Sequence, residues 1–200
     1  MRVIEFFEGF PDERVVQVGH EGGALVSWQV GSVDEGVAAE AAGCDLVVAQ
    51  GIEAGGHVRG TTALNDLLPA VLGAVGVPVV AAGGIGTPER AAELTAAGAD
   101  AVRVGTRFLA CPECDTHPVY VEALLAAGAG DTVLTGDFDD GGRWPATVRV
   151  LSDSLRRARH AGNRSTEPPS KRADDPLAMA CYAGTSVDAL TSIESASAVF

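Results

Sequence analysis

Hydrophobic and polar positions divide the chain into short apolar runs and longer Ala-rich segments. The apolar runs include residues 3–7, 25–30 and 77–82, where Val and Ile recur. The segments between the runs carry Ala and Leu with the spacing of one face of a helix. Continuous apolar strands joined by helices are typical of a parallel sheet covered on both faces, so the pattern predicts an α/β fold.

An internal repeat gives the order of these elements. Residues 34–51 and 89–105 match when Gly43 is aligned with Gly98, an offset of about 55 residues. Each stretch predicts an Ala-rich helix, a Gly suited to the left-handed position after the helix, and a short buried strand. The predicted N-caps are Ser32 or Asp34 for the first helix and Thr87, followed by Pro88, for the second.

The spacing of the repeat indicates a particular parallel fold. Two strand–helix units in about 55 residues is the pitch of a (β/α)8 TIM barrel, which needs roughly 250 residues. A chain of 200 residues holds about five such units. We expect an incomplete TIM barrel over residues 1–158, then an extension over 159–200 with a loop at 161–176 and a short helix around 177–182. An open five-stranded parallel sheet is the alternative from topology alone.

Composition and charge narrow the classes of partner. The chain is 46% hydrophobic and carries a formal net charge of −13, which repels nucleic acid and anionic lipid, so neither is an expected partner. No apolar run approaches the ~20 residues that a membrane span needs. Carboxylates interrupt any signal-peptide core at the start of the sequence, so we expect a cytoplasmic protein. Four scattered cysteines predict no disulfide framework.

The first segment whose residues could take part in catalysis or binding is 50–57, Gln-Gly-Ile-Glu-Ala-Gly-Gly-His. It includes the last residue of a predicted strand and the turn that follows it. In barrel folds the carboxyl ends of the strands face the active site. The Gly pair lets the backbone approach a ligand closely and presents His57 at this end. His57 can act as a general base or pair with a developing anion; the alternative is a loop histidine bonded to backbone.

Two glycine turns predict a phosphate site. Residues 81–88 read as strand, glycine turn and capped helix start, and successive backbone N–H groups at such a turn cradle a phosphate. The next strand ends at residues 103–108, and barrels often build a phosphate site from the loops after neighbouring strands. Arg107 would either add charge there or pack elsewhere. The predicted phosphate residues are Gly83, Gly84, Gly105 and Thr106.

Two other segments contain possible metal ligands, but we predict no metal site in either. Cys111 and Cys114 precede His117, but the sequence has no second Cys pair, so no metal site is expected. Residues 136–145 hold three acids beside glycines but lack the full EF-hand pattern. We predict a surface loop there.

The motifs resemble one known family, the nitronate monooxygenases, formerly called 2-nitropropane dioxygenases. The similar segments, in order, are Ala-Gln-Gly-Ile-Glu-Ala-Gly-Gly-His at 49–57, Val-Val-Ala-Ala-Gly-Gly-Ile at 79–85 and Gly-Thr-Arg-Phe-Leu-Ala at 105–110, then Glu113 and His117-Pro118. The resemblance covers about residues 3–155 and resumes at 178–184. The family's first strands, with a Gln-Gly-Gly-type motif, have no counterpart, so the first strand here corresponds to about the fourth of eight.

The resemblance implies a barrel that holds FMN non-covalently. The glycine turns would bind its phosphate, and His57 would be the active-site base. The implied cofactor-binding residues are Gln29, Gln50, Gly51, Gly56, Gly83, Gly84, Gly105 and Thr106, of which Gln29 and Gln50 match positions that contact the flavin or its ribityl chain.

The implied reaction is the oxidation of an alkyl nitronate with O2 to a carbonyl compound and nitrite. His57 would orient the anionic nitronate or remove the α-proton of a nitroalkane. FMN- and NADH-dependent enoyl-acyl-carrier-protein reductase, which has very similar motifs, is one alternative. A non-catalytic barrel fragment, or a half-barrel that works as a homo-oligomer, is the other.

Overall fold

The computed structural model describes residues 2–138 and 147–199. Contacts divide the chain into two compact units whose segments alternate along the sequence. Unit 1 comprises Met1–Ile52, Arg59–Ala82 and Ala91–Arg103, and unit 2 comprises Glu53–Val58, Gly83–Arg90 and Val104–Phe200. The boundary at residue 158 stays a prediction, and helix α6 (Ser152–Ala161) continues across that position.

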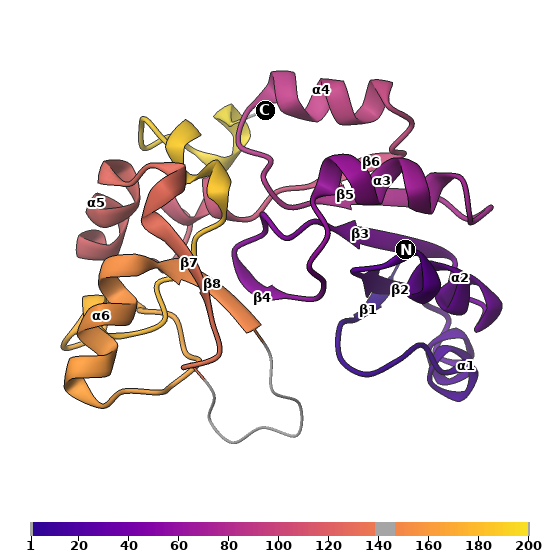
Figure 1. Ribbon diagram of the computed structural model, residues 1–200, viewed down its shortest axis with the longest axis horizontal. Coiled ribbons are helices and arrows are strands. Elements are labelled where there is room, and N and C mark those ends of the chain that lie inside the picture. The colour runs from indigo at the N-terminus through magenta and orange to yellow at the C-terminus, as the bar shows by residue number, and fades with distance from the viewer. Residues whose placement is uncertain (1, 139–146, 200) are drawn as a thin grey trace. The chain divides into compact units, whose positions relative to one another are not determined.

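Unit 1 is built on a five-stranded sheet in which every neighbouring pair is parallel (Figure 1). In spatial order its strands are β1 (Val3–Phe6), β2 (Leu25–Val30), β3 (Leu46–Gln50), β5 (Val79–Ala82) and β6 (Ala101–Arg103). The spatial order follows the chain order, which is the arrangement that successive β/α units produce. The predicted parallel α/β sheet is therefore confirmed.

The two faces of this sheet differ in chemistry. Helices α1 (Glu13–Glu21), α2 (Val33–Ala41) and α3 (Leu64–Leu72) pack on the sheet, and α4 (Pro88–Ala96) precedes β6. On one face Trp28 is buried, with its ring 5.1 Å from that of Phe6. On the other, Arg103 donates hydrogen bonds to Glu5 and, at 2.8 Å, to Gln29 Oε1. The face that carries Gln29 and Arg103 also holds the buried apolar residues Val48 and Ala82, so it is mixed in character.

The helix ends of the repeat are reproduced in three dimensions, but its second strand, β6, is largely exposed and not buried as predicted. Gly43 and Gly98 both adopt positive φ, +92° and +110°, as the predicted left-handed helix ends require. Two residues after each glycine, an aspartate carboxylate accepts a hydrogen bond from the amide at the start of a neighbouring strand, at 2.7 Å for Asp45 and 2.8 Å for Asp100. The hydrogen bond from the Val26 amide, together with the one to the His20 side chain, lowers the pKa of the Asp45 carboxyl.

The predicted helix starts are also confirmed. Ser32 Oγ accepts from the amide of Glu35 at 3.2 Å, so Ser32 rather than Asp34 caps α2. Thr87 Oγ1 accepts from the amide of Arg90 at 3.2 Å, immediately before Pro88 opens α4. Each hydroxyl satisfies one of the amides that lack a partner within the helix.

A partly buried ion pair ties together three loops at the carboxyl ends of the unit 1 strands. Arg59 forms a forked pair with Glu35, with N–O distances of 3.0 and 3.1 Å, and its guanidinium also donates to the carbonyls of Phe7 and Gly9. The Arg59 amide donates to Gln50 Oε1 at 2.8 Å. The loops after β1, β2 and β3 therefore share one guanidinium group.

Unit 2 contains a three-stranded antiparallel sheet, which the sequence patterns did not predict. Its strands, in the order β4-β8-β7, are β4 (Gly56–Val58), β8 (Thr147–Leu151) and β7 (Thr132–Thr135). The helical segments are α5 (Pro118–Ala126), α6, and the short 3-10 segments η1 (Thr106–Ala110), η2 (Ala129–Asp131), η3 (Pro176–Ala178), η4 (Thr185–Ala189) and η5 (Ala196–Ala198). These strands are too short and too mixed in composition to stand out in the sequence.

Two predicted elements of unit 2 need correction. The short helix expected around 177–182 is a single 3-10 turn, η3, followed by extended chain in which Tyr182 forms a β-bridge with Val150. In the predicted surface loop at 136–145, Phe138 is instead a core side chain, packed with Val148 and Leu155. Residues 139–146 of that loop lie outside the described residues.

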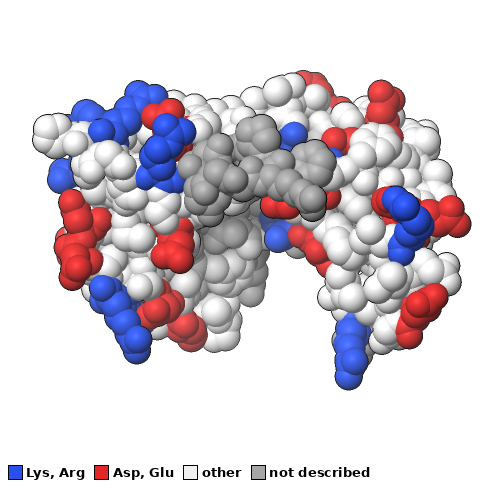
Figure 2. Space-filling view, turned by 90° about the horizontal axis from the view of Figure 1, so that it is seen from below, with Lys and Arg blue, Asp and Glu red and all other residues white. Residues whose placement is uncertain are grey.

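Figure 2 shows both basic and acidic side chains on this face, with several basic ones gathered at its upper left. Within residues 2–138 and 147–199, no helix combines the length and apolar character needed to cross a membrane.

Glu35→Gln tests the importance of the Arg59 ion pair. The side chains of Arg59 and Glu35 are 12% and 20% exposed, and removing one member of such a pair leaves the other charge poorly compensated. We expect the free energy of unfolding to fall by about 3 kcal/mol, measured by urea denaturation.

Asp153→Asn is the matched control, because Asp153 pairs with arginines at the surface and is 52% exposed. It should change the free energy of unfolding by less than about 0.5 kcal/mol. Equal effects of the two substitutions would show that the Arg59 pair has no special role.

Candidate functional site

The Gly-Gly-His segment of unit 2 lies directly against the C-terminal part of the chain. A Cβ atom on Gly55 would be 2.4 Å from the amide nitrogen of Gly184, so only glycine fits there. The Glu53 carbonyl accepts a hydrogen bond from the amide of Thr185 at 3.0 Å. The sequence suggested that Gly55 allows close approach to a ligand; in the structure its neighbour is the protein's own backbone.

His57 lies on strand β4, opposite Val148 of β8. It is therefore a strand residue and not the loop residue that either interpretation of the sequence assumed. The preceding Gly56 has φ +75°, which turns the chain into the strand. The imidazole ring is partly exposed, with its centroid 5.9 Å from that of the Tyr182 ring.

The first glycine turn has the conformation that the sequence predicted. Gly83 and Gly84 both have positive φ, +98° and +68°, which other residues adopt only with strain. A Cβ on Gly84 would be 3.1 Å from Cβ of Glu53, so the turn contacts the Gly-Gly-His segment. Gly86 is required for a different reason, because a Cβ there would be 2.8 Å from Ala189 of η4.

The second glycine turn reaches the same stretch of chain. Thr106 is buried, and its hydroxyl oxygen accepts a hydrogen bond from the amide of Gly184 at 2.9 Å. The hydroxyl proton of Thr106 is not used in that bond and can be donated to an anion. A Cβ on Gly105 would meet no atom within 4 Å, so space is open beside this residue.

The backbone amides at these turns lack acceptors among the described residues. The hydrogen bonds within residues 2–138 and 147–199 include none donated by the N–H of Gly84, Gly105 or Thr106. Amides without an acceptor among the described residues, together with a hydroxyl proton and the open space beside Gly105, are a donor set that can cradle a phosphate. The residues present therefore fit a phosphate group.

Arg107, which could have added charge to this cradle, is occupied elsewhere. It is buried, and its guanidinium pairs with Glu194 at 2.7 Å and donates to the Ser192 carbonyl at 3.3 Å. The packing alternative is therefore confirmed. Arg107 fastens the C-terminal segment to η1.

The remaining predicted site residues, Gln29, Gln50 and Gly51, belong to unit 1. Gln29 Oε1 accepts from Arg103, and Gln50 Oε1 from the Arg59 amide. Both glutamine side chains are buried and held in fixed positions. The Gly51 amide donates to the Ala82 carbonyl at 2.9 Å, so this glycine continues the β3–β5 pairing.

The cysteines and His117 have structural roles. His117 Nδ1 accepts from the amide of Val119 at 3.2 Å and so caps α5. Within the described parts of the chain, no group of three or more His, Cys, Asp or Glu side chains is arranged to hold a metal ion. All four cysteines are free, and burial raises the pKa of Cys44 to about 11 and of Cys181 to about 12, so both are neutral thiols at pH 7.

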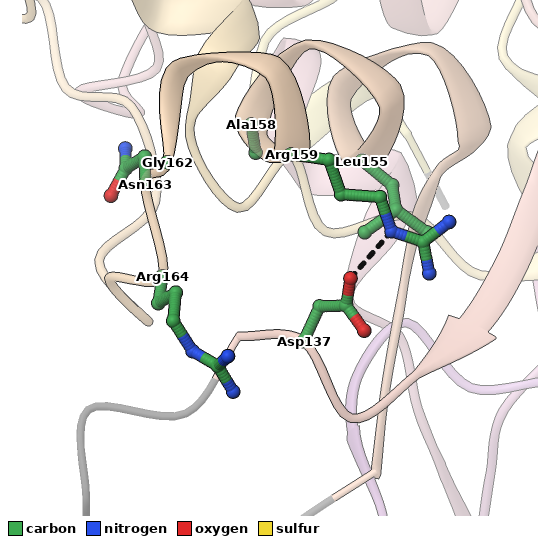
Figure 3. Close-up of a pocket in the computed structure, with 7 residues that line it drawn as sticks. All are labelled: Asp137, Leu155, Ala158, Arg159, Gly162, Asn163 and Arg164. Carbon is green, nitrogen blue, oxygen red and sulfur yellow. Dashed lines mark hydrogen bonds and ion pairs between the residues drawn. The ribbon is translucent and has the colours of Figure 1, made fainter.

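Two cavities in unit 2 lie apart from the predicted site residues. One, of about 190 Å³, is lined by Asp137, Asn163 and Arg164 among others (Figure 3). In it Arg159 pairs with Asp137 at 2.5 Å, and this hydrogen bond lowers the pKa of the Asp137 carboxyl. The other, of about 230 Å³, includes Cys111 and Ile193 in its lining.

Sequence reasoning missed the role of residues 182–185. Gly184 and Thr185 contact the Gly-Gly-His segment, the first glycine turn and Thr106. The available signal was the glycine in Tyr182-Ala183-Gly184, which was noted as part of the resemblance but not connected to the turns. No periodicity links segments so far apart in the chain.

The fold and the turns define the class of protein: a parallel α/β protein of the TIM-barrel type with donor-rich glycine turns in unit 2. The model of the nitronate monooxygenase family matches residues 1–199, and the chain belongs to that family. The nitronate monooxygenase of Pseudomonas aeruginosa PAO1 is 44% identical over 143 residues, which cover 66% of this chain and 40% of the relative. The resemblance found in the sequence is thus confirmed.

Two solved structures are similar across almost the whole chain. Nitroalkane oxidase from Streptomyces ansochromogenes is 33% identical with a TM-score of 0.77, covering 94% of this chain and 59% of the other. The M276A mutant of FabK from Thermotoga maritima is 33% identical with a TM-score of 0.74, covering 97% and 62%. The matches span about two-fifths of the length of the curated relatives.

Gly55→Ala tests the backbone contact that organises the site. The new methyl group would overlap the Gly184 amide, and relieving the overlap requires backbone movement. We expect unfolding free energy to fall by about 1–3 kcal/mol in urea denaturation. Gly130→Ala, where a Cβ meets nothing within 4 Å, is the control and should behave like the unmodified chain. Two indistinguishable unfolding curves would contradict the contact.

Proposed function

We propose that this chain carries the flavin phosphate site and the active-site base of a nitronate monooxygenase. The observation that supports it best is the set of amides at Gly84, Gly105 and Thr106 without internal acceptors, beside the Thr106 hydroxyl. FMN is the proposed cofactor, since its terminal phosphate suits that donor set. Bound there, FMN would supply the electron chemistry that no protein side chain provides.

His57 is the proposed base. It is partly exposed on β4, next to a glycine turn, so a substrate can reach its imidazole. Neutral His57 would take the α-proton of a nitroalkane, which becomes the nitronate while the imidazole becomes imidazolium; it would also orient a nitronate supplied directly. The proposed products, after reaction with O2, are a carbonyl compound and nitrite.

The remaining elements of the proposal come from the resemblance. Gln29, Gln50, Gly51 and Gly56 are proposed to contribute to the flavin site. The five parallel strands are proposed to be C-terminal units of an eight-stranded barrel, which agrees with the 59% and 62% of the solved relatives that the chain covers. A cytoplasmic location and association into homo-oligomers remain predictions.

A second candidate is an FMN- and NADH-dependent enoyl-acyl-carrier-protein reductase. The similarity to FabK, at 33% identity, is the observation that supports this second candidate function. NADH consumption with an enoyl thioester would identify this activity, whereas a nitronate oxidase should leave NADH unchanged.

Titration of the 200-residue chain with FMN, followed by flavin fluorescence, tests the phosphate site. We expect saturable binding, and at least tenfold weaker binding for Gly105→Val, because the new side chain would fill the space beside the amide donors. Gly130→Val is the control, since its Cβ also meets nothing within 4 Å but lies in η2. No binding, or equal binding by the two variants, would contradict the proposal.

His57→Asn tests the base. Loss of a positioned general base typically lowers the rate by about 10²–10⁴-fold, so we expect turnover of neutral nitroalkanes to fall by at least that lower factor. The affinity for FMN should stay the same, because His57 is not among the phosphate donors. Unchanged nitroalkane and nitronate turnover would exclude His57 from the chemistry.

A further inference from the structure

Two segments far apart in the sequence share one edge of strand β8. Strand β4 pairs antiparallel with Thr147–Arg149, and Tyr182 continues the edge by bridging Val150. The flanking bonds run from the Leu151 amide to the Cys181 carbonyl at 2.8 Å and from the Ala183 amide to the Arg149 carbonyl at 3.2 Å. His57 and Tyr182 therefore lie along the same edge of β8, opposite residues that are two positions apart.

The side chains of His57 and Tyr182 lie on the same face of this sheet. His57 is opposite Val148, and Tyr182 is opposite Val150, two residues further along β8. Paired residues of an antiparallel ladder, and residues two apart in a strand, share a face. Their ring centroids are 5.9 Å apart and the ring planes are inclined by 46°, which is within the range of favourable aromatic contacts.

Tyr182 is held more firmly than a strand residue needs to be. Its hydroxyl donates to the Thr166 carbonyl at 2.5 Å, and its own carbonyl accepts from the hydroxyl of Tyr120. Tyr120 is fully buried, and burial raises its pKa well above the usual value, so it stays a neutral donor at any physiological pH. The ring of Tyr182 is thus fixed at its backbone and at its far end.

We propose that Tyr182 is a positioning residue that sets the orientation of the His57 imidazole. This rests on the proposed function of His57 as the base. A ring fixed at both ends restricts rotation of the neighbouring imidazole toward that side, so less orientational freedom is lost when substrate is bound. Gly55 makes the arrangement possible, because its missing side chain admits the 183–184 backbone that carries Tyr182.

The ring contact is testable without flavin or turnover. The chain has 4 His and 2 Tyr, so NMR of selectively labelled full-length chain gives few ring signals, and His57→Asn and Tyr120→Phe assign them. We expect cross-relaxation between the His57 and Tyr182 rings, and His57 ring signals that move more in Tyr182→Leu than in Tyr182→Phe. Absence of cross-relaxation in the unmodified chain would overturn the proposal, even if Tyr182→Leu fails to fold.

Kinetics separate positioning from simple support of the fold. Tyr182→Leu should lower kcat with nitroalkane by about 10–100-fold with KM within twofold, since a misplaced catalytic group costs rate and not binding. Tyr182→Phe keeps the ring and its backbone contacts but loses the hydroxyl bond to Thr166, so it should lower kcat less than Tyr182→Leu. Equal losses in the two variants, or a kcat unaffected by Tyr182→Leu, would overturn the positioning role.

Failure of the proposed function gives a different result. A chain with the ring contact but without nitronate or nitroalkane turnover would overturn the function of His57, and with it any positioning role in that reaction. Turnover without the ring contact would overturn the role of Tyr182 alone.

Discussion

The close passage of two backbone segments, at Gly55 and Gly184, is the constraint on which the candidate site of unit 2 depends. A side chain on Gly55 would push away the segment whose amides bond to Thr106 and to the Glu53 carbonyl. Those two bonds bring the Gly-Gly-His segment and the second glycine turn to one stretch of chain. Removing the contact would therefore separate His57, the proposed base, from the proposed phosphate donors, even though neither takes part in the contact.

Thr106 combines a structural hydrogen bond with a proposed contribution to anion binding. Its oxygen accepts from Gly184, which fixes the hydroxyl, and its proton remains for an anion. Space is open beside Gly105, and the amides of Gly84, Gly105 and Thr106 have no acceptor among the described residues. Because neutral amides and a hydroxyl supply the donors, an anionic group can be bound by a chain whose net charge is −13. The nearby cation, Arg107, is neutralised by Glu194.

Unit 1 is held together by polar contacts of a different kind. Repeated aspartates fasten each helix end to a neighbouring strand, and Arg59 joins the loops after three strands. Arg103 donates a hydrogen bond to Gln29 and the Arg59 amide donates one to Gln50, two residues that the resemblance assigns to the flavin. Hydrogen bonds to the side chains of Gln29 and Gln50 agree with the general need of a cofactor site for side chains that do not reorganise on binding.

The sequence by itself determined the elements whose information is local. Apolar runs located all five parallel strands, and glycine, proline and hydroxyl residues located the helix ends, because strand burial, left-handed φ and capping depend on a few neighbouring residues. The glycine turns at 83–84 were predictable for the same reason. Family membership followed from three motifs in a fixed order, which local composition cannot imitate.

Only the tertiary structure decided what depends on distant partners. The antiparallel sheet pairs β4 with a strand some ninety residues later, and short mixed strands carry no periodic signal of that pairing. The partner of Arg107, the burial of Phe138 and the absence of a helix at 177–182 depend on the same long-range packing. The sequence therefore identified His57 as a candidate, but its place on a strand edge beside Tyr182 is set by contacts that form only when the chain folds.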